Sequence, residues 1–126
     1  MIVVDASVVI ALLDARDAQH EKAVAALGSA GDPLAASVVT IAEILVGPAR
    51  AGRLAAARAA LAGLELASIP IDADGASRLA ELRTETGLKL PDCCVLLAAE
   101  ESRATTVLSF DDRLRSAAAT LGLQAP

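Results

Sequence analysis

The sequence predicts a single α/β domain around a mainly parallel sheet, and three observations support this fold class. Short apolar runs of strand length alternate with longer helical segments along the chain. The first run, residues 2–4, is β-branched throughout, which is typical of a strand buried on both faces. The length of 126 residues is enough for one domain with a core and short for two, so we expect one domain over residues 1–126.

Apolar spacing, with Gly and Pro as stop signals, predicts the remaining elements. Helices are predicted at residues 8–13, 20–27, 37–50, 53–61, 75–86, 91–102 and 112–121. Strands are predicted at residues 34–36, 66–71 and 105–108, and the tail is a candidate last edge strand. Gly28 ends the second helix, a turn at residues 31–33 follows it, and Pro91 opens the sixth helix at a position that suits proline. Gly47 and Pro48 are expected to break the third helix.

Composition narrows the classes of function. With one Phe and no Trp or Tyr, the chain lacks an aromatic platform for stacking bases. Its uncharged runs fall far short of the ~20 residues that a membrane-spanning helix needs, and no leader segment opens it, so we expect a cytoplasmic protein without a membrane partner. The adjacent Cys93 and Cys94 fit neither a zinc pair nor a disulfide framework, and we expect buried free thiols.

Asp5 directly follows the first strand and precedes an apolar helix. A carboxylate in this place lies at the carboxyl edge of the sheet, where open α/β sheets keep their ligand sites. The alternative is that Asp5 only caps the next helix by accepting its free amide protons. This stretch alone leaves both interpretations open.

Glu43 is the only charged residue between Asp32 and Arg50. The segment around it is apolar nearly all round, which predicts a buried helix, where an ionised carboxylate is costly unless it is paired or holds a metal. Thr40 and Glu43 also have the spacing of a capping box, which would make Glu43 a structural cap. Because the apolar run begins before Thr40, we favour a site role for Glu43.

Asp92 and Asp111 repeat the pattern of an acid at the end of an element. Asp92 follows Pro91 at a helix start, where it could simply complement the helix dipole. Asp111 follows the strand at residues 105–108, and either it or Asp112 could be the cap of the last helix. By spacing we assign Asp111 to the site and Asp112 to the helix or solvent.

Taken together, the four carboxylates indicate a cation site. Clustered carboxylates cannot all stay ionised without a cation, and oxygen ligands without Cys or His favour Mg²⁺ or Mn²⁺ over zinc. The net charge of −5 at first disfavours a nucleic-acid partner. If four of the sixteen acids hold a cation, twelve remain against eleven bases, and the charge argument becomes neutral.

The chain resembles the PIN-domain ribonucleases, in particular the VapC-type toxins of bacterial toxin–antitoxin pairs. The matching segments, in the family's order and spacing, are residues 4–9, 40–50, 90–92 and 108–111. The resemblance implies a three-layer α/β/α fold, a magnesium-dependent endoribonuclease and a small antitoxin that covers the site. It also implies that Asp5, Glu43, Asp92 and Asp111 form the acidic cluster and that Ser7 orients Asp5 or a metal-bound water. Ser109 stands where this family often has Thr.

Basic residues are candidates for contact with RNA. Arg50, Arg53 and Arg58 occur between Glu43 and Glu65 without an acid among them, which predicts a positive face or an ordinary solvated helix surface. The second candidates are Arg113 and Arg115 beside Asp111. His20 lies in a polar segment that is typical of a solvated helix start. Because the chain is so hydrophobic, we also expect a homodimer and antitoxin binding through apolar helical surface.

Two other functions compete with the ribonuclease. In a receiver-like signalling module, an acidic pocket with a metal accepts a phosphoryl group. That fold needs a lysine after a late strand, whereas Lys89 precedes Pro91 in a loop, and it has no place for Glu43. The other candidate is an interaction module of the same fold without catalytic activity.

Overall fold

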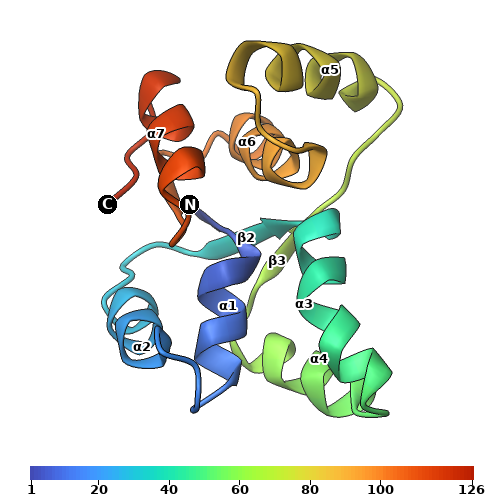
Figure 1. Cartoon of the computed structure of the whole chain (residues 1–126), viewed down its shortest axis with the longest axis vertical. Helices are drawn as coiled ribbons and strands as arrows, with labels where there is room; N and C mark the ends of the chain where they lie inside the picture. Colours follow the sequence, from blue (N-terminus) through green and yellow to red (C-terminus); the bar gives the residue numbers. More distant parts are fainter.

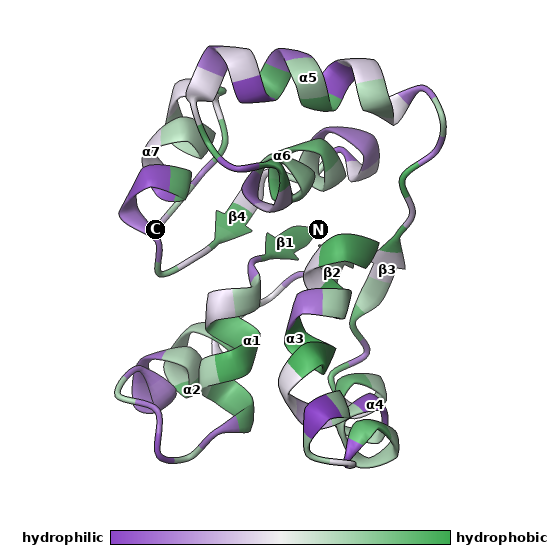
Figure 2. Ribbon diagram, turned by 45° about the vertical axis from the view of Figure 1, so that its right-hand side comes forward, coloured by the Kyte–Doolittle hydropathy of each residue, from purple (hydrophilic) through white to green (hydrophobic).

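A computed structural model describes residues 1–126 and has four parallel strands and seven helices (Figure 1). The strands are β1 (Ile2–Val4), β2 (Leu34–Ser37), β3 (Ala67–Ile69) and β4 (Thr106–Leu108). The helices are α1 (Ala6–Leu13), α2 (His20–Gly28), α3 (Val38–Arg50), α4 (Leu54–Gly63), α5 (Gly75–Thr86), α6 (Leu90–Ser102) and α7 (Asp112–Thr120). The predicted fold class is confirmed, because helices cover both faces of an all-parallel sheet (Figure 2).

Alternating side chains of the strands divide the core into two layers. Val3, Ala35 and Val107 point to one face of the sheet and pack with buried residues of α5, α6 and α7. Ile2 and Val4 point to the other face and pack with α1, α3 and α4. Side chains of a strand alternate between its faces, so the short β-branched run of β1 supplies both layers at once.

The sheet order is β3-β2-β1-β4. The chain therefore builds outward from β1 to β3 and then returns to the other side of β1, which makes the junction of β1 and β4 the switch point of the sheet. The tail lies beside β4 through a single bridge between Thr106 and Gln124, short of the full edge strand that was a candidate. No helix reaches the length and apolar character of a membrane-crossing segment.

The predicted break at Gly47 and Pro48 is wrong, since α3 runs on to Arg50. Pro48 occupies the last turn, so its missing N–H removes one helical hydrogen bond and leaves the rest intact. The Pro48 carbonyl then accepts the Arg53 N–H at 2.8 Å, which fixes the connection to α4. Cys93 and Cys94 are buried free thiols, as predicted.

Candidate active site

The switch point of the sheet brings together residues that lie a hundred positions apart in the chain. Asp5 follows β1, and Ser109 follows the neighbouring strand β4. The Asp5 N–H donates to the Leu108 carbonyl at 2.9 Å, which continues the β1–β4 pairing to the end of both strands. The carboxyl edge here is the place where a parallel sheet opens a crevice for a ligand.

Asp5 is held in this place by three hydrogen bonds and is only 7% exposed. Its Oδ1 accepts the Ala6 N–H at 2.8 Å, and its Oδ2 accepts the hydroxyls of Ser7 and Ser109, each at 2.8 Å. Both interpretations of Asp5 therefore hold: it caps α1, and it lies at the ligand edge of the sheet. Since an ionised carboxylate has about four acceptor positions, Asp5 keeps capacity for one more partner.

The two serine hydroxyls also tie Asp5 to the segment before α7. The Ser7 Oγ accepts the Phe110 N–H at 3.1 Å, and the Ser109 Oγ accepts the Asp111 N–H at 3.0 Å. Each hydroxyl thus donates to the carboxylate and accepts from the backbone, which fixes its orientation. Asp111 is positioned relative to Asp5 through Ser109.

Glu43 and Asp92 share the electrostatic environment of Asp5. Partial burial is the main cause that raises the pKa of Glu43, followed by the charges of Asp5 and Asp92. Partial burial likewise raises the pKa of Asp92, helped by the charges of Asp5 and Asp111 and opposed by Lys89 and Arg113. The four predicted acids therefore lie in one neighbourhood, where like charges make ionisation harder.

The environment of Glu43 differs from the prediction of a buried helix, which is wrong. Only Thr40 and Ile44 of α3 are buried, and Glu43 is exposed on the surface of the helix, although neighbouring elements shield its carboxylate in part. Glu43 has apolar neighbours in the sequence because one face of α3 packs against the core, whereas apolar residues on its other face are exposed. The capping-box alternative also falls away, because Ser37 caps α3 by accepting the Val39 N–H at 3.2 Å.

The structure separates the roles of Asp111 and Asp112, which the sequence left open. Asp111 is the cap of α7: its Oδ1 accepts the N–H groups of Arg113 at 2.8 Å and Leu114 at 3.2 Å. Its Oδ2 makes no hydrogen bond, and its charge reaches Asp92. Asp112 instead pairs with Arg115 at 3.1 Å, and its side chain is 92% exposed. Asp111 therefore faces the cluster while it caps the helix.

The donors in this neighbourhood fit a hard divalent ion, although the side chains are not drawn together into a ligand shell. No three His, Cys, Asp or Glu side chains are grouped closely enough to hold a metal ion. The donors nearby are carboxylate and hydroxyl oxygens, which suit Mg²⁺ or Mn²⁺. Glu43 has three side-chain torsions and Asp92 has two, so rotation can bring these carboxylates toward the fixed Asp5.

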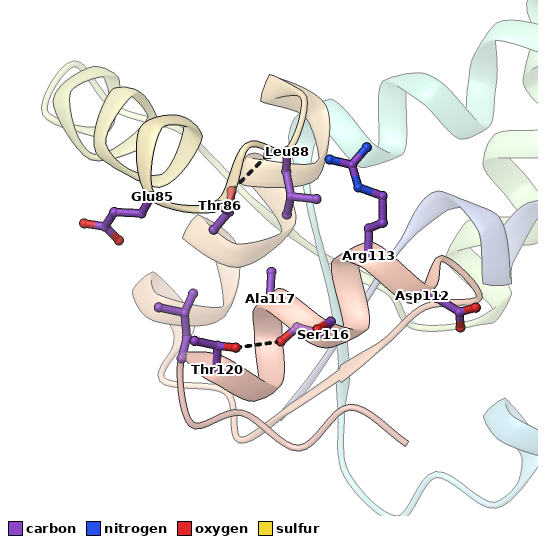
Figure 3. A pocket seen from close by; sticks show the side chains of 9 residues that line it. Glu85, Thr86, Leu88, Asp112, Arg113, Ser116, Ala117 and Thr120 are labelled. Atoms are coloured by element: carbon purple, nitrogen blue, oxygen red, sulfur yellow. Dashed lines mark hydrogen bonds between the residues drawn. The ribbon is translucent and has the colours of Figure 1, made fainter.

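Arg113 is the predicted basic residue with a charge that reaches the cluster. It extends from α7 beside Leu88 and lines the largest cavity, about 490 Å³, between α7 and the end of α5 (Figure 3). Arg50 lies seven residues beyond Glu43 on α3, which is about 10 Å along the helix axis, and Arg53 lies beyond the end of α3. His20 is half-buried, and its Nδ1 bonds to the Ala11 carbonyl at 2.8 Å, so it joins α2 to α1 and stays outside the cluster.

Sequence reasoning missed two residues near the cluster. Lys89 lies in the loop before Pro91, as predicted, and as the N-cap residue of α6 its positive charge opposes the rise in the pKa of Asp92. Its position three residues before Asp92, at a helix start marked by Pro91, was the available signal. Thr40 is fully buried one turn before Glu43, and its Oγ1 has no hydrogen-bond partner. No pattern in the sequence distinguishes it from an ordinary core threonine.

Comparison with known proteins finds solved structures of similar fold. No curated protein matches the chain by sequence. Among solved structures, a toxin–antitoxin complex from Klebsiella pneumoniae has a chain that is 29% identical, with a TM-score of 0.75 over 88% of this chain and 87% of that one. VapC20 of Mycobacterium tuberculosis, a sarcin–ricin loop cleaving toxin, is 21% identical, with a TM-score of 0.79 over 93% and 95% of the two chains. VapBC2 of Rickettsia felis, bound to a DNA fragment from its promoter, is 16% identical, with a TM-score of 0.71 over 100% and 98%.

The family is shown by sequence as well as by shape. The PIN domain model matches residues 2–119, which spans β1 to α7 and includes all four acids. This match confirms the resemblance that the four motifs indicated. The fold is therefore not that of a receiver-like signalling module. The chain belongs to the PIN domain family.

Proposed function

We propose that this chain is a metal-dependent endoribonuclease that acts as the toxin of a toxin–antitoxin pair in the cytoplasm. The observation that carries the proposal is a buried Asp5, fixed by three hydrogen bonds at the switch point of the sheet and electrostatically coupled to Glu43 and Asp92. The PIN domain match supports a nuclease, and the structural likeness to toxin–antitoxin complexes supports the biological role.

Each residue has a distinct part in this proposal. Asp5, Glu43, Asp92 and Asp111 would hold Mg²⁺ or Mn²⁺. When bound, such an ion polarises a phosphate oxygen and lowers the pKa of a coordinated water. Ser7 and Ser109 keep the Asp5 carboxylate in one orientation.

Basic residues in two places would bind the RNA strand. Lys89 and Arg113 place positive charge beside Asp92, where it can attract a phosphate group of the strand. Arg50 and Arg53 would contact the strand farther along α3. Partial burial, followed by the charges of neighbouring carboxylates, raises the pKa values of Glu43 and Asp92, and binding of a cation would favour their ionised forms.

A cleavage assay with two matched variants tests the proposal. Asp92→Asn removes a charge from the cluster, whereas Asp32→Asn removes the same charge from an exposed residue before β2, at the opposite end of the sheet. On end-labelled single-stranded RNA with Mg²⁺, we expect Asp92→Asn to lose at least ~10²-fold in rate, Asp32→Asn to keep its rate, and EDTA to stop cleavage by the wild type. Full activity of a folded Asp92→Asn variant, or cleavage in EDTA, would contradict the assignment, and an inactive wild type would favour the interaction module.

The structure offers apolar surface for the proposed partners. Val38, Ala42, Val46 and Ala49 are exposed and recur at helical spacing along α3, which gives that helix an apolar stripe. Ile10 and Leu13 at the end of α1 are exposed as well. Because exposed apolar stripes of this kind are typical of interfaces, we propose that they serve homodimer formation and antitoxin binding.

A further inference from the structure

A cavity of about 270 Å³ lies between α2 and the segment that joins β4 to α7. Figures 1 and 2 show α2 and the start of α7 on the same side of the molecule. Its polar lining comes from Lys22 and Ser29 of the α2 region and from Ser109 and Arg115 of the β4–α7 region. Cavities that take drug-sized ligands measure roughly 300–1000 Å³, so this one suits a single group of a longer ligand.

The charge of the lining favours an anion. Two cationic side chains, Lys22 and Arg115, line the cavity together with the C-terminal residue Pro126, and no Asp or Glu side chain does. This is unusual in a chain with a net charge of −5. The Lys22 ammonium lies 5.1 Å from the centre of the Phe110 ring, a cation–π distance that holds the charge at the cavity.

Arg115 has donors to spare. Its Nη1 pairs with Asp112 at 3.1 Å, and its Nε is buried without any hydrogen-bond partner. Buried hydrogen-bond donors normally have an acceptor. Because the Nε–H of Arg115 has none, the guanidinium can gain a hydrogen bond from an acceptor that binds here and reorients the side chain. The competing Asp112 carboxylate is largely exposed, so water weakens its hold on Arg115.

The cavity adjoins the candidate active site through two residues. Ser109 lines the cavity and also donates to Asp5 Oδ2, and Phe110, which lines it too, is followed by Asp111. A ligand group in the cavity would therefore lie within one or two residues of the acidic cluster. Because a nucleic-acid strand carries its phosphate groups at short, regular intervals, one strand can place neighbouring phosphates at the cluster and in the cavity.

We propose that this cavity binds a phosphate group of the RNA strand next to the phosphate at the acidic cluster, with Lys22 and Arg115 as its cationic contacts. This subsite rests on the proposed ribonuclease function. It extends the contact with RNA to a side of the cluster that the arginines of α3 do not reach. In this proposal the Lys22 ammonium, which lies over the Phe110 ring, binds the phosphate.

Binding measured without cleavage tests the subsite. Fluorescence anisotropy of a labelled single-stranded RNA in EDTA compares the wild type, the Lys22→Gln/Arg115→Gln variant and an Arg16→Gln/Arg103→Gln control that removes the same charge from exposed positions. We expect the cavity variant to lose about tenfold in affinity and its salt dependence to fall by roughly 0.7 in slope, as the loss of one phosphate contact predicts for a single strand. The control should keep most of its affinity and should bind more tightly than the cavity variant.

A titration followed by nuclear magnetic resonance separates failure of the subsite from failure of the proposed function. Pyrophosphate added to the wild type should shift the amide signals of Lys22, Phe110 and Arg115, whether or not the protein cleaves RNA. If RNA binds and is cleaved but the cavity variant binds it as tightly as the control, the subsite is wrong and the ribonuclease stands. If RNA neither binds nor is cleaved while pyrophosphate shifts these signals, the anion cavity stands and its assignment to RNA falls. Absence of any shift with pyrophosphate overturns the subsite.

Discussion

Asp5 and its neighbouring acids differ in how their charges are held. Asp5 accepts three hydrogen bonds, which fix the orientation of its carboxylate. Glu43 and Asp92 lack this support, and partial burial together with nearby carboxylates raises their pKa values. The site therefore combines one carboxylate of fixed orientation with two whose ionised forms gain when a cation binds, a division that the residue types alone do not reveal.

Ser109→Ala tests how the fixed anion is held. The change removes one donor to Asp5 Oδ2 and the acceptor of the Asp111 N–H, and an unpaired buried group costs about 1–3 kcal/mol of unfolding free energy. We expect chemical denaturation to show a loss in that range and RNA cleavage to fall by at least about tenfold, because Asp5 and Asp111 both lose a constraint. Ser109→Thr keeps the hydroxyl and should retain most of both properties. An alanine variant with unchanged stability and activity would show that the bridge has no role.

Glu43→Gln tests the repulsion within the cluster through pH. Because the pKa of Glu43 is raised on folding, the native state binds this proton more tightly than the unfolded chain, and stability falls as pH rises from about 4.5 through the folded pKa. Glutamine has no such loss. In EDTA at pH 7 the variant should melt a few degrees above the wild type, which corresponds to less than about 1 kcal/mol for a group in contact with water. Near pH 4 the difference should disappear.

The control for this experiment is Glu101→Gln, which removes the same charge from an exposed position at the far end of α6 and should leave the melting temperature near that of the wild type. Adding Mg²⁺ should raise the melting temperature of the wild type more than that of Glu43→Gln, since a ligand that binds the native state stabilises it by mass action. A Glu43→Gln variant that melts below the wild type at pH 7 in EDTA would show that Glu43 makes a favourable contact instead.

At the scale of elements, helix and strand positions were largely predictable because local signals mark their ends. Ser37, Pro91 and Asp111 each stand at or near a helix start, and the short apolar runs before Ser37 and Asp111 form strands. The burial of α3 was not predictable, because a helix rich in Val and Ala looks apolar whether it is enclosed or exposed on one side. Only tertiary packing shows that one of its faces is left open.

Pro48→Ala tests the finding that α3 continues past its proline. Alanine restores an N–H that can donate to the Ile44 carbonyl and has a much higher helix propensity, so the free energy of unfolding should rise by about 1 kcal/mol, less than the ~3 kcal/mol for a helix interior because Pro48 is in the last turn. Pro70→Ala, in the loop after β3, should bring no gain, since it only frees the unfolded chain. A fall in stability for Pro48→Ala would mean that the proline ring itself fixes the turn into α4.

At the scale of the whole molecule, the sequence predicted that these acids lie near one another better than it predicted what surrounds them. Three acids at element ends and a fourth within a helix implied one cluster, and the order β3-β2-β1-β4 brings Asp5 beside Ser109. The cavity between α2 and α7 could not be foreseen, because Lys22 and Arg115 meet only through the packing of distant segments. Local patterns specify elements and their ends, whereas cavities depend on how layers meet.

The exposed stripe on α3 leads to a prediction about assembly. Val46 is 45% exposed at the middle of this stripe, and Val24 is similarly exposed, at 47%, on α2. If two copies of the chain pack through α3, a lysine at position 46 buries a charge in the interface, which is costly because no partner is placed to pair with it. Sedimentation should then show dimers for the wild type and Val24→Lys and a shift to monomers for Val46→Lys, with unchanged melting of the monomer fold. A wild type that stays monomeric when concentrated would refute self-association, and a dimer that survives Val46→Lys would place the contact on another face.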